Sequence, residues 1–250
     1  MLKNEREREI LQLLKDGNGY MSVRELCAAL YASESSIRRD LTVLESKGEI
    51  KRTHGGAELK LHFSNVAEFH RRTHDHASAK REIAAKAATL IKEGMVVFLD
   101  QSSTSFYLAC ELMNKTSLTI VTNNVEILGL MASSRHCVLG SGGYLSAENR
   151  NCLQGADAHR IFEQMRADIL FFSTKALTAD GTLLDCTREE ILVRRAMLEH
   201  ARQRVFLCDS SKFDGNASYK QCTLADVDVL ISEGNAAERF GNDFPSLTIK

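Results

Sequence analysis

The stretch SESSIRRDLTVL, residues 33–44, decides how the amino-terminal part of this chain folds. Ser33 is a good N-cap residue, because its hydroxyl can accept a hydrogen bond from an amide of the first helical turn. The apolar residues Ile37, Leu41 and Leu44 follow at helical spacing. The stretch therefore predicts a helix with one face buried in a small core.

The other face of this predicted helix carries polar side chains. Ser35, Arg39 and Thr42 lie opposite the apolar stripe, and Arg38 lies on its flank. Such a face suits the major groove of DNA, where arginine can bond guanine in a bidentate manner. An ordinary surface helix with solvated charges fits the stretch alone about as well, so the neighbouring residues must decide.

The preceding residues predict two more helices. Residues 2–15 have an amphipathic pattern, and the turn sequence DGNG follows at 16–19. Ser22 can cap a second short helix, with Glu25 three residues later completing a capping box. A tight turn then leads into the helix from Ser33. This order indicates a helix-turn-helix whose last member is the recognition helix.

A β-hairpin is predicted after the recognition helix. Residues 49–53 alternate as in a strand, and glycines at 55–56 supply a turn. The hairpin would form a wing that holds Lys51, Arg52 and His54 close to DNA phosphates. A basic hairpin without a nucleic acid partner is the alternative, and the adjacent helix-turn-helix makes it the weaker one.

These motifs resemble the signature of the DeoR/GlpR family of bacterial repressors. Members have a Ser-x-x-Thr-Ile-Arg-Arg-Asp-Leu helix and an Arg-x-His-Gly-Gly-Ala wing; this chain has SESSIRRDL at 33–41 and KRTHGGA at 51–57. Ser36 replaces the usual threonine and Ala32 the usual valine. The resemblance implies a winged helix-turn-helix that binds double-stranded operator DNA as part of an oligomer. The candidate DNA-binding residues are Ser33, Ser35, Ser36, Arg38, Arg39, Thr42, Lys51, Arg52 and His54.

Composition limits the remaining possibilities. Two hundred and fifty residues suit two domains, and a formal net charge of −1 excludes a uniformly basic protein but not a local basic patch. No apolar run approaches the roughly 20 residues that cross a bilayer, and the charged start lacks a secretion signal. The seven cysteines are scattered, so we expect mostly small buried side chains in a reducing cytoplasm, with no metal or cofactor.

The segment between the two predicted domains has no clear period. Residues 59–78 are expected to form a polar linker between a DNA-binding domain at 1–58 and an α/β domain at 79–250. His74 and His76 are too few and too close to each other to predict a metal site.

The second domain alternates apolar strands with helices. Strand-like runs begin at residues 95, 118, 137, 167, 205 and 227, and the helix before the first run is expected to span residues 78–94. This alternation predicts an α/β fold with a mostly parallel sheet covered on both faces.

Polar clusters follow these strands, at the edge where such sheets bind ligands. Residues 101–105 open a helix and could hold a phosphate, while a glycine pair at 142–143 lets the backbone approach a ligand. Lysines could bind an anion, and acidic or amide side chains could bond sugar hydroxyls. Each feature alone is also explained by a helix cap, a turn or a solvated lysine.

The resemblance extends to this domain, which is similar to the family's sensor domain and to the fold of ribose-5-phosphate isomerase. It implies that the domain senses a phosphorylated sugar. Ser102 stands where the family usually has glycine, which restrains the loop, and Lys175 lies in a turn where many relatives have glycine. The candidate effector-binding residues are Asp100, Ser102, Ser103, Thr104, Asn123, Gly142, Gly143, Lys175, Asp209 and Lys212.

Two functions follow from this sequence. The first is a transcriptional repressor of carbohydrate genes, controlled by a phosphorylated sugar and acting as a homodimer or homotetramer on paired half-sites. An activator is a variant of it, because operator position sets the sign. The second is a sugar-phosphate isomerase with an appended DNA-binding domain, in which Asp100, Asp185 or Glu189 would be the base. No spacing singles out one of these carboxylates.

Overall fold

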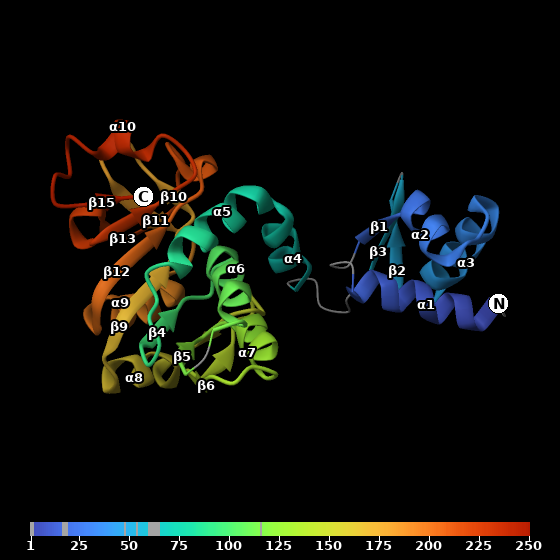
Figure 1. The fold of residues 1–250 in the computed structure, drawn as a ribbon, viewed down its shortest axis with the longest axis horizontal. Coiled ribbons are helices and arrows are strands. Elements are labelled where there is room, and N and C mark those ends of the chain that lie inside the picture. Colours follow the sequence, from blue (N-terminus) through green and yellow to red (C-terminus); the bar gives the residue numbers. More distant parts are fainter. Residues whose placement is uncertain (1–2, 17–19, 48, 54, 60–65, 116) are drawn as a thin grey trace. The chain divides into compact units, whose positions relative to one another are not determined.

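The computed structural model describes residues 3–16, 20–47, 49–53, 55–59, 66–115 and 117–250. The chain forms two compact units, Met1–His70 and Arg71–Lys250 (Figure 1). Each unit is described by itself below.

The first unit combines three helices with a small antiparallel sheet. Its elements are α1 (Lys3–Asp16), β1 (Tyr20–Ser22), α2 (Val23–Leu30), α3 (Glu34–Ser46), β2 (Ile50–Arg52) and β3 (Gly56–Leu59). The sheet order is β1-β3-β2. The predicted helices and hairpin are confirmed, whereas β1 was not predicted because three residues are too few to show alternation.

Capping fixes the starts of α2 and α3. The Ser22 hydroxyl accepts a hydrogen bond from the Glu25 amide, and the Glu25 carboxylate accepts one from the Ser22 amide, which completes the predicted capping box. Ser33 caps α3 by accepting from the Ser36 amide. The core beneath these helices includes the predicted apolar stripe of α3: Ile37, Leu41 and Leu44 are all buried.

Helices occupy much of the segment expected to be a linker. The structure has α4 over Val66–His74, and α5 begins at Ala77. Basic residues lie in the last turn of α4, where they complement the partial negative charge of a helix end. Helix α4 is only nine residues long, too short to show a clear helical period, so no helix was predicted here. Helix α5 (Ala77–Ala88) also ends earlier than the predicted residue 94.

The second unit is built on a seven-stranded parallel sheet. Its order is β15-β14-β12-β9-β4-β5-β6, and each neighbouring pair is parallel. The strands are β4 (Val96–Leu99), β5 (Thr119–Thr122), β6 (Cys137–Gly140), β9 (Ala167–Phe172), β12 (Ala201–Leu207), β14 (Val229–Ile231) and β15 (Thr248–Ile249). All six predicted strands are present, and β15 is an addition at one edge.

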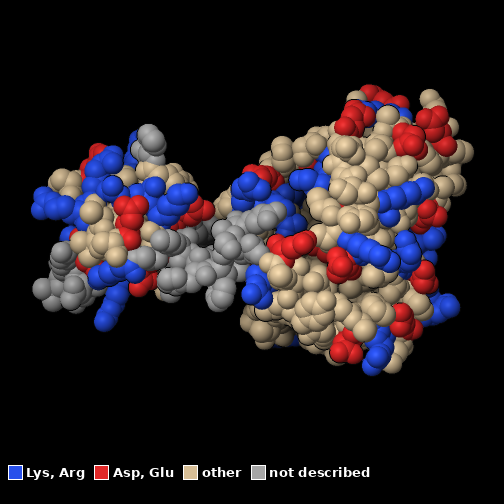
Figure 2. Space-filling model, turned by 180° about the vertical axis from the view of Figure 1, so that it is seen from behind, with Lys and Arg blue, Asp and Glu red and all other residues tan. Residues whose placement is uncertain are grey.

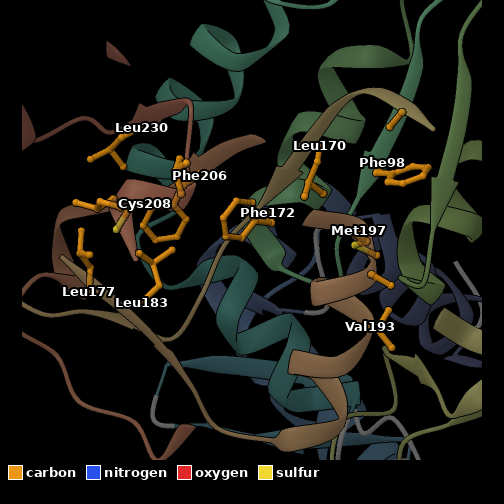
Figure 3. Close-up of a cluster of buried hydrophobic side chains, with 14 of the residues drawn as sticks. Phe98, Leu170, Phe172, Leu177, Leu183, Val193, Met197, Phe206, Cys208 and Leu230 are labelled. Atoms are coloured by element: carbon orange, nitrogen blue, oxygen red, sulfur yellow. The ribbon is translucent and has the colours of Figure 1, made fainter. Parts of the chain in front are cut away.

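Helices cover both faces of this sheet, as the alternation predicted (Figure 1). One buried cluster packs one face against α5, α6 (Ser103–Leu112) and α7 (Val125–Met131). The other packs the opposite face against α8 (Ala156–Gln164), α9 (Arg188–Glu199) and α10 (Ala236–Phe240). Figure 3 shows the second cluster, in which Phe172 and Phe206 from neighbouring strands lie with ring centroids 5.3 Å apart.

Short strands and turns outside the main sheet escaped prediction. One two-stranded sheet consists of β7 (Tyr144–Leu145) and β8 (Leu153–Gln154). A three-stranded sheet consists of β10 (Ala176–Leu177), β11 (Thr182–Asp185) and β13 (Tyr219–Thr223). Two single turns of 3₁₀ helix, η1 (Ser210–Lys212) and η2 (Leu224–Asp226), follow β12 and β13. Elements this short carry no periodic signal.

The expectation that most cysteines are buried was wrong. Only Cys152 and Cys208 are buried, and Cys137 and Cys186 are exposed. Across the described ranges, no helix combines the length and apolar character needed to cross a bilayer.

Candidate DNA-binding surface and effector site

Helix α3 presents a polar face to solvent. Ser33, Ser35, Arg39 and Thr42 are exposed, while Ser36 is half-buried beside the Ser33 hydroxyl. This follows from the burial of the apolar stripe on the opposite side. Arg39 forms no hydrogen bond or ion pair with any residue that the structure describes, so its guanidinium is available to a ligand.

Arg38 is also exposed, but it is paired within its own helix. Its guanidinium lies 2.6 Å from the Glu34 carboxylate one turn earlier. Because both side chains are more than half exposed, the pair is worth little in water and can be exchanged for another anion.

The wing brings two candidate residues together. Arg52 on β2 donates to the hydroxyl of Thr42 on α3, over 2.8 Å. The same guanidinium donates to Glu45, also on α3. Lys51 is exposed, and His54 lies outside the described residues. The hairpin and the recognition helix therefore form one continuous polar surface.

Asp40 is a structural residue that the sequence analysis missed. It is buried within the SESSIRRDL motif and forms an ion pair with Arg6 of α1. A second pair joins Glu7 of α1 to Lys47 at the end of α3, over 2.6 Å. The signal for Asp40 was present, because an acid at position 40 falls on the buried side of the helix next to Leu41.

Basic side chains are exposed at several places on this unit (Figure 2).

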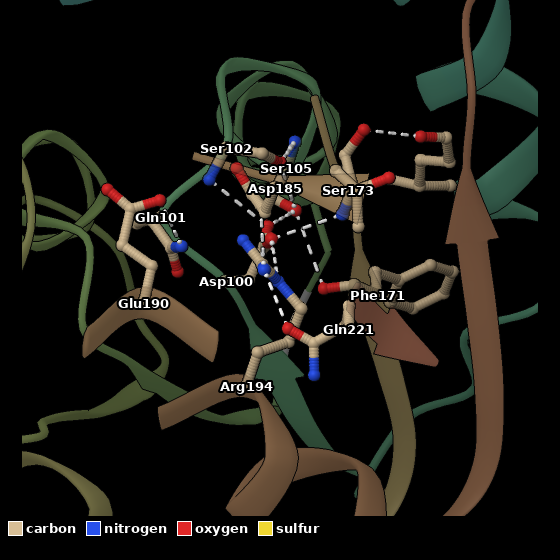
Figure 4. A network of polar contacts seen from close by, with 12 residues as sticks. Asp100, Gln101, Ser102, Ser105, Phe171, Ser173, Asp185, Glu190, Arg194 and Gln221 are labelled. Atoms are coloured by element: carbon tan, nitrogen blue, oxygen red, sulfur yellow. Dashed lines mark hydrogen bonds and ion pairs between the residues drawn. The ribbon is translucent and has the colours of Figure 1, made fainter. Parts of the chain in front are cut away.

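In the second unit, Asp100 follows β4 and is fully buried. Its Oδ1 accepts from the Ser102 amide and the Ser105 hydroxyl, at 3.1 and 2.6 Å. Its Oδ2 accepts from the Ser173 amide and from Nε of Arg194, both at 3.1 Å (Figure 4). Four protein donors therefore occupy the carboxylate predicted to meet a sugar.

Arg194, on α9, is a second residue that the sequence analysis missed. It is buried, and its guanidinium also donates to Asp185 at 2.8 Å and to Gln221 at 3.0 Å. Burial alone would lower its pKa, but the carboxylates of Asp185 and Asp100 raise it, so this arginine stays charged. It neutralises two buried carboxylates and ties α9 to the carboxyl edge of the sheet (Figure 4).

The hydroxyl-rich loop after β4 starts helix α6. Ser102 caps the helix by accepting from the Ser105 amide, with φ −74° and ψ 152°, a conformation that serine adopts without strain. A serine at this position therefore introduces no backbone strain. Ser103 and Thr104 are buried in the first turn. The Thr104 hydroxyl has no hydrogen-bond partner among the described residues.

Asn123 follows β5, next to this loop. Its amide nitrogen donates to Gln101 at 3.3 Å, and Gln101 donates to Glu190 at 3.1 Å. Its carbonyl oxygen Oδ1 is buried without a partner in the described part of the chain. Asn123 is therefore held in place through its amide nitrogen, while its buried carbonyl oxygen keeps an unused capacity to accept a hydrogen bond.

Asp209 and Lys212 follow β12, on the other side of Asp100. The Lys212 ammonium donates to the hydroxyl of Ser173, next to Asp100, and lies 3.6 Å from Oδ2 of Asp209. That oxygen accepts no hydrogen bond from the residues described. Burial alone would raise the pKa of Asp209, but Lys212 and a hydrogen bond from Ser211 lower it.

Lys80, on α5, adds a second positive charge here and was not predicted. Its buried ammonium donates to the backbone carbonyls of Arg72 and Asp75, at the end of α4. Burial, and then the positive charge of Lys212, lower the pKa of Lys80 to about 8. Lys80 shares the buried face of α5 with Ile83 and Ala84, and this apolar pattern gave no reason to single it out from the sequence.

The remaining predicted residues are placed differently. Gly142 and Gly143 follow β6, both with positive φ, and a Cβ on Gly143 would meet the Gln154 carbonyl at 2.3 Å. Gly143 is therefore needed for packing of the β7–β8 hairpin. Lys175 is exposed, and its amide donates to Leu184 of β11. Within the described residues, Lys175 forms no ion pair with Asp100 and shares no hydrogen bond with Lys212.

The carboxylates considered as general bases have structural partners or face solvent. Asp100 and Asp185 both bind Arg194, and Glu189 is exposed on α9. Within the described residues, no three His, Cys, Asp or Glu side chains gather as metal ligands do.

A helix-turn-helix unit with an exposed polar face, joined to an α/β unit with a polar strand edge, defines a two-domain DNA-binding regulator. Two family models match the chain: the DeoR-like helix-turn-helix domain over residues 6–61, and the DeoR C terminal sensor domain over residues 75–234. The chain belongs to the DeoR family of transcription regulators.

Several curated relatives match along nearly their whole length. The glycerol-3-phosphate regulon repressor of Haemophilus influenzae is 33% identical, with 93% of this chain and 90% of the relative covered. The regulator GolR of Listeria innocua is 32% identical over 93% and 91%. The L-fucose operon activator of Haemophilus influenzae is 32% identical over 92% of each chain. Among solved structures, ribose 5-phosphate isomerase A from Methanocaldococcus jannaschii is 18% identical, with a TM-score of 0.41 over 54% of this chain and 53% of that chain.

Proposed function

We propose that this chain represses genes of carbohydrate metabolism, and that a phosphorylated sugar controls its affinity for operator DNA. In this proposal α3 enters the major groove, Arg39 bonds base edges, and Lys51 and Arg52 contact the phosphate backbone. Named relatives support the repressor class, since two of those covered almost completely are glycerol-3-phosphate regulon repressors. One relative is named an activator, so whether this chain represses or activates its genes must be measured separately.

The observation that carries the effector site is a set of buried polar atoms that have no hydrogen-bond partner in the described residues. They are Oγ1 of Thr104, Oδ1 of Asn123 and Oδ2 of Asp209, and all three residues follow parallel strands at one edge of the sheet. A buried polar atom left unpaired costs about 1–3 kcal/mol, which the hydroxyls of a sugar can recover. Lys212 and Lys80 supply positive charge for a phosphate.

Binding at this edge acts on DNA affinity by favouring one conformation over another. A coupling of about 1–3 kcal/mol is enough for a useful switch. Paired operator half-sites call for a homodimer or a homotetramer, and the protein works in the cytoplasm, where the DNA is. No catalytic role is proposed, because Asp100 and Asp185 are neutralised by Arg194.

The test is a thermal-shift screen of the full chain against phosphorylated sugars, each beside its unphosphorylated counterpart. A sugar phosphate that binds the native state raises the melting temperature, and the same compound changes binding to an operator selected from random duplex DNA. Thr104→Val is the informative variant: its missing hydroxyl had no partner, so folding is preserved while the ligand response falls. Ser133→Ala, beyond the end of α7 and on the surface, is the matched control.

Two results would reject the proposal. One is a wild-type chain that binds no DNA sequence selectively. The other is a Thr104→Val chain that responds to every sugar phosphate as the wild type does. Turnover of a sugar phosphate by the purified chain would support the isomerase alternative instead.

A further inference from the structure

Tyr31 has an unusual backbone conformation in the turn between α2 and α3. Its φ of 50° and ψ of 41° lie in the left-handed region, where its amide donates to the Cys27 carbonyl and closes helix α2. Glycine or asparagine usually occupies such a position, because a bulky side chain there is strained. The chain therefore accepts a conformational cost at this residue.

Packing within the chain does not offset that cost. Tyr31 is 97% exposed, and the next large apolar residue among those whose burial is described is Tyr144, at 59%. The described structure gives its ring and hydroxyl no hydrogen bond and no aromatic contact. A strained residue whose side chain projects fully into water points to a role in binding rather than in folding.

The position of Tyr31 identifies the partner. It lies two residues before Ser33, the N-cap of the recognition helix. In helix-turn-helix proteins the first turn of that helix contacts the base edges, so the residues just before it lie at the edge of the major groove, close to backbone phosphates. Tyrosine hydroxyls are among the groups that donate to phosphate oxygens. The exposed hydroxyls of Ser33 and Ser35 continue the same surface.

We propose that Tyr31 is a positioning residue for DNA binding: its phenolic O–H donates to a backbone phosphate beside the groove that α3 enters. This inference rests on α3 being the recognition helix. The contact is independent of base sequence, so it strengthens binding to operator and to unrelated duplex alike. In this arrangement the exposed ring carries the hydroxyl beyond the turn toward the phosphate.

Two variants of the full chain separate binding from folding. Tyr31→Asn relieves the backbone strain, so its melting temperature should rise, while its affinity for selected operator and for unrelated duplex should fall by the same factor, about tenfold. Tyr31→Phe keeps the ring and loses the hydroxyl, and should lose most of the same affinity. Tyr144→Phe, an exposed tyrosine of the second unit at 59% exposure, is the control and should bind as wild type.

Fluorescence anisotropy with both duplexes, beside a thermal melt and sedimentation of each variant, gives the answer. Tyr31→Asn with wild-type affinity would overturn the proposal, as would Tyr31→Phe with wild-type affinity. A loss of affinity that sedimentation traces to a smaller oligomer would also overturn it, because Tyr31 would then contact a second copy. Failure of the recognition-helix assignment is recognised separately, by operator selectivity that survives Arg39→Ala.

Discussion

The guanidinium of Arg52, on the wing, lies 2.9 Å from the carboxylate of Glu45, on the recognition helix. The Arg52 amide donates to the same side chain at 3.0 Å. Two elements that are predicted to meet DNA are thus joined by a negative charge that DNA phosphates would repel. This relationship leads to the first prediction.

Glu45→Gln should increase affinity for any duplex by about threefold, because it removes a charge that repels phosphates and releases Arg52 to contact one. Folding should change little, since both side chains are partly exposed and such pairs contribute about 0–1 kcal/mol. Anisotropy titrations at two salt concentrations measure the effect. Glu9→Gln, an exposed glutamate of α1, is the control. Weaker binding by Glu45→Gln would mean that the pair orients Arg52 for DNA.

Arg39→Ala and Lys51→Ala should separate base recognition from backbone contact. Arg39 is free of partners in the described residues, so its loss should cost about 1–3 kcal/mol on operator DNA and much less on unrelated DNA. Lys51→Ala should weaken binding to operator and to unrelated DNA alike, and should reduce the slope of log affinity against log salt concentration by about one. Competition titrations with the two duplexes measure the ratio of the affinity for operator to the affinity for unrelated DNA. Equal operator affinity for wild type and Arg39→Ala would contradict the recognition assignment.

Arg194→Met should destabilise the second unit by about 3–5 kcal/mol. The substitution leaves the buried carboxylates of Asp100 and Asp185 without their counter-charge. Urea unfolding followed by circular dichroism measures the loss. Arg188→Met, which removes an exposed arginine from the start of the same helix, is the control. If the ion pairs of Arg194 with Asp100 and Asp185 did not stabilise the fold, the Arg194→Met variant would unfold at the same urea concentration as the wild type.

Lys80 should titrate near pH 8 in the folded protein. Its folded pKa lies below the ordinary value of 10.5, so the unfolded chain binds more protons between these two values, and stability contributed by this residue rises with pH across that interval. Nitrogen-15 NMR of the lysine ammonium groups follows the titration, with the urea-unfolded chain as reference.

Two variants test the origin of this shift. Lys212→Met removes a positive charge and should raise the pKa of Lys80, whereas Asp209→Asn removes a negative charge and should lower it further. Unchanged titration in both variants would show that Lys80 does not sense the charges after β12.

Periodicity and capping were enough to predict both domains. Ser22 and Ser33 marked helix starts through local hydrogen bonds, and runs such as Phe98 to Asp100 marked strands that end in polar residues. These signals are local, so they survive in the sequence. Very short strands left no such signal: β7 and β10 have two residues each, too few to show the alternation of a strand, so they were not predicted.

The sequence by itself determined which residues reach the carboxyl edge of the sheet, because strand ends are set by local apolar runs. Only the tertiary structure decided which of them keep a polar atom without a hydrogen-bond partner in the described residues. Asp100 accepts hydrogen bonds from Ser173, just after β9, and from Arg194 on α9, whereas Thr104 and Asn123 keep an atom without a hydrogen-bond partner among the described residues. Arg194 and Lys80 reach this edge from helices distant in sequence. Hydrogen-bond saturation depends on such long-range neighbours, so no pattern along the chain could reveal it.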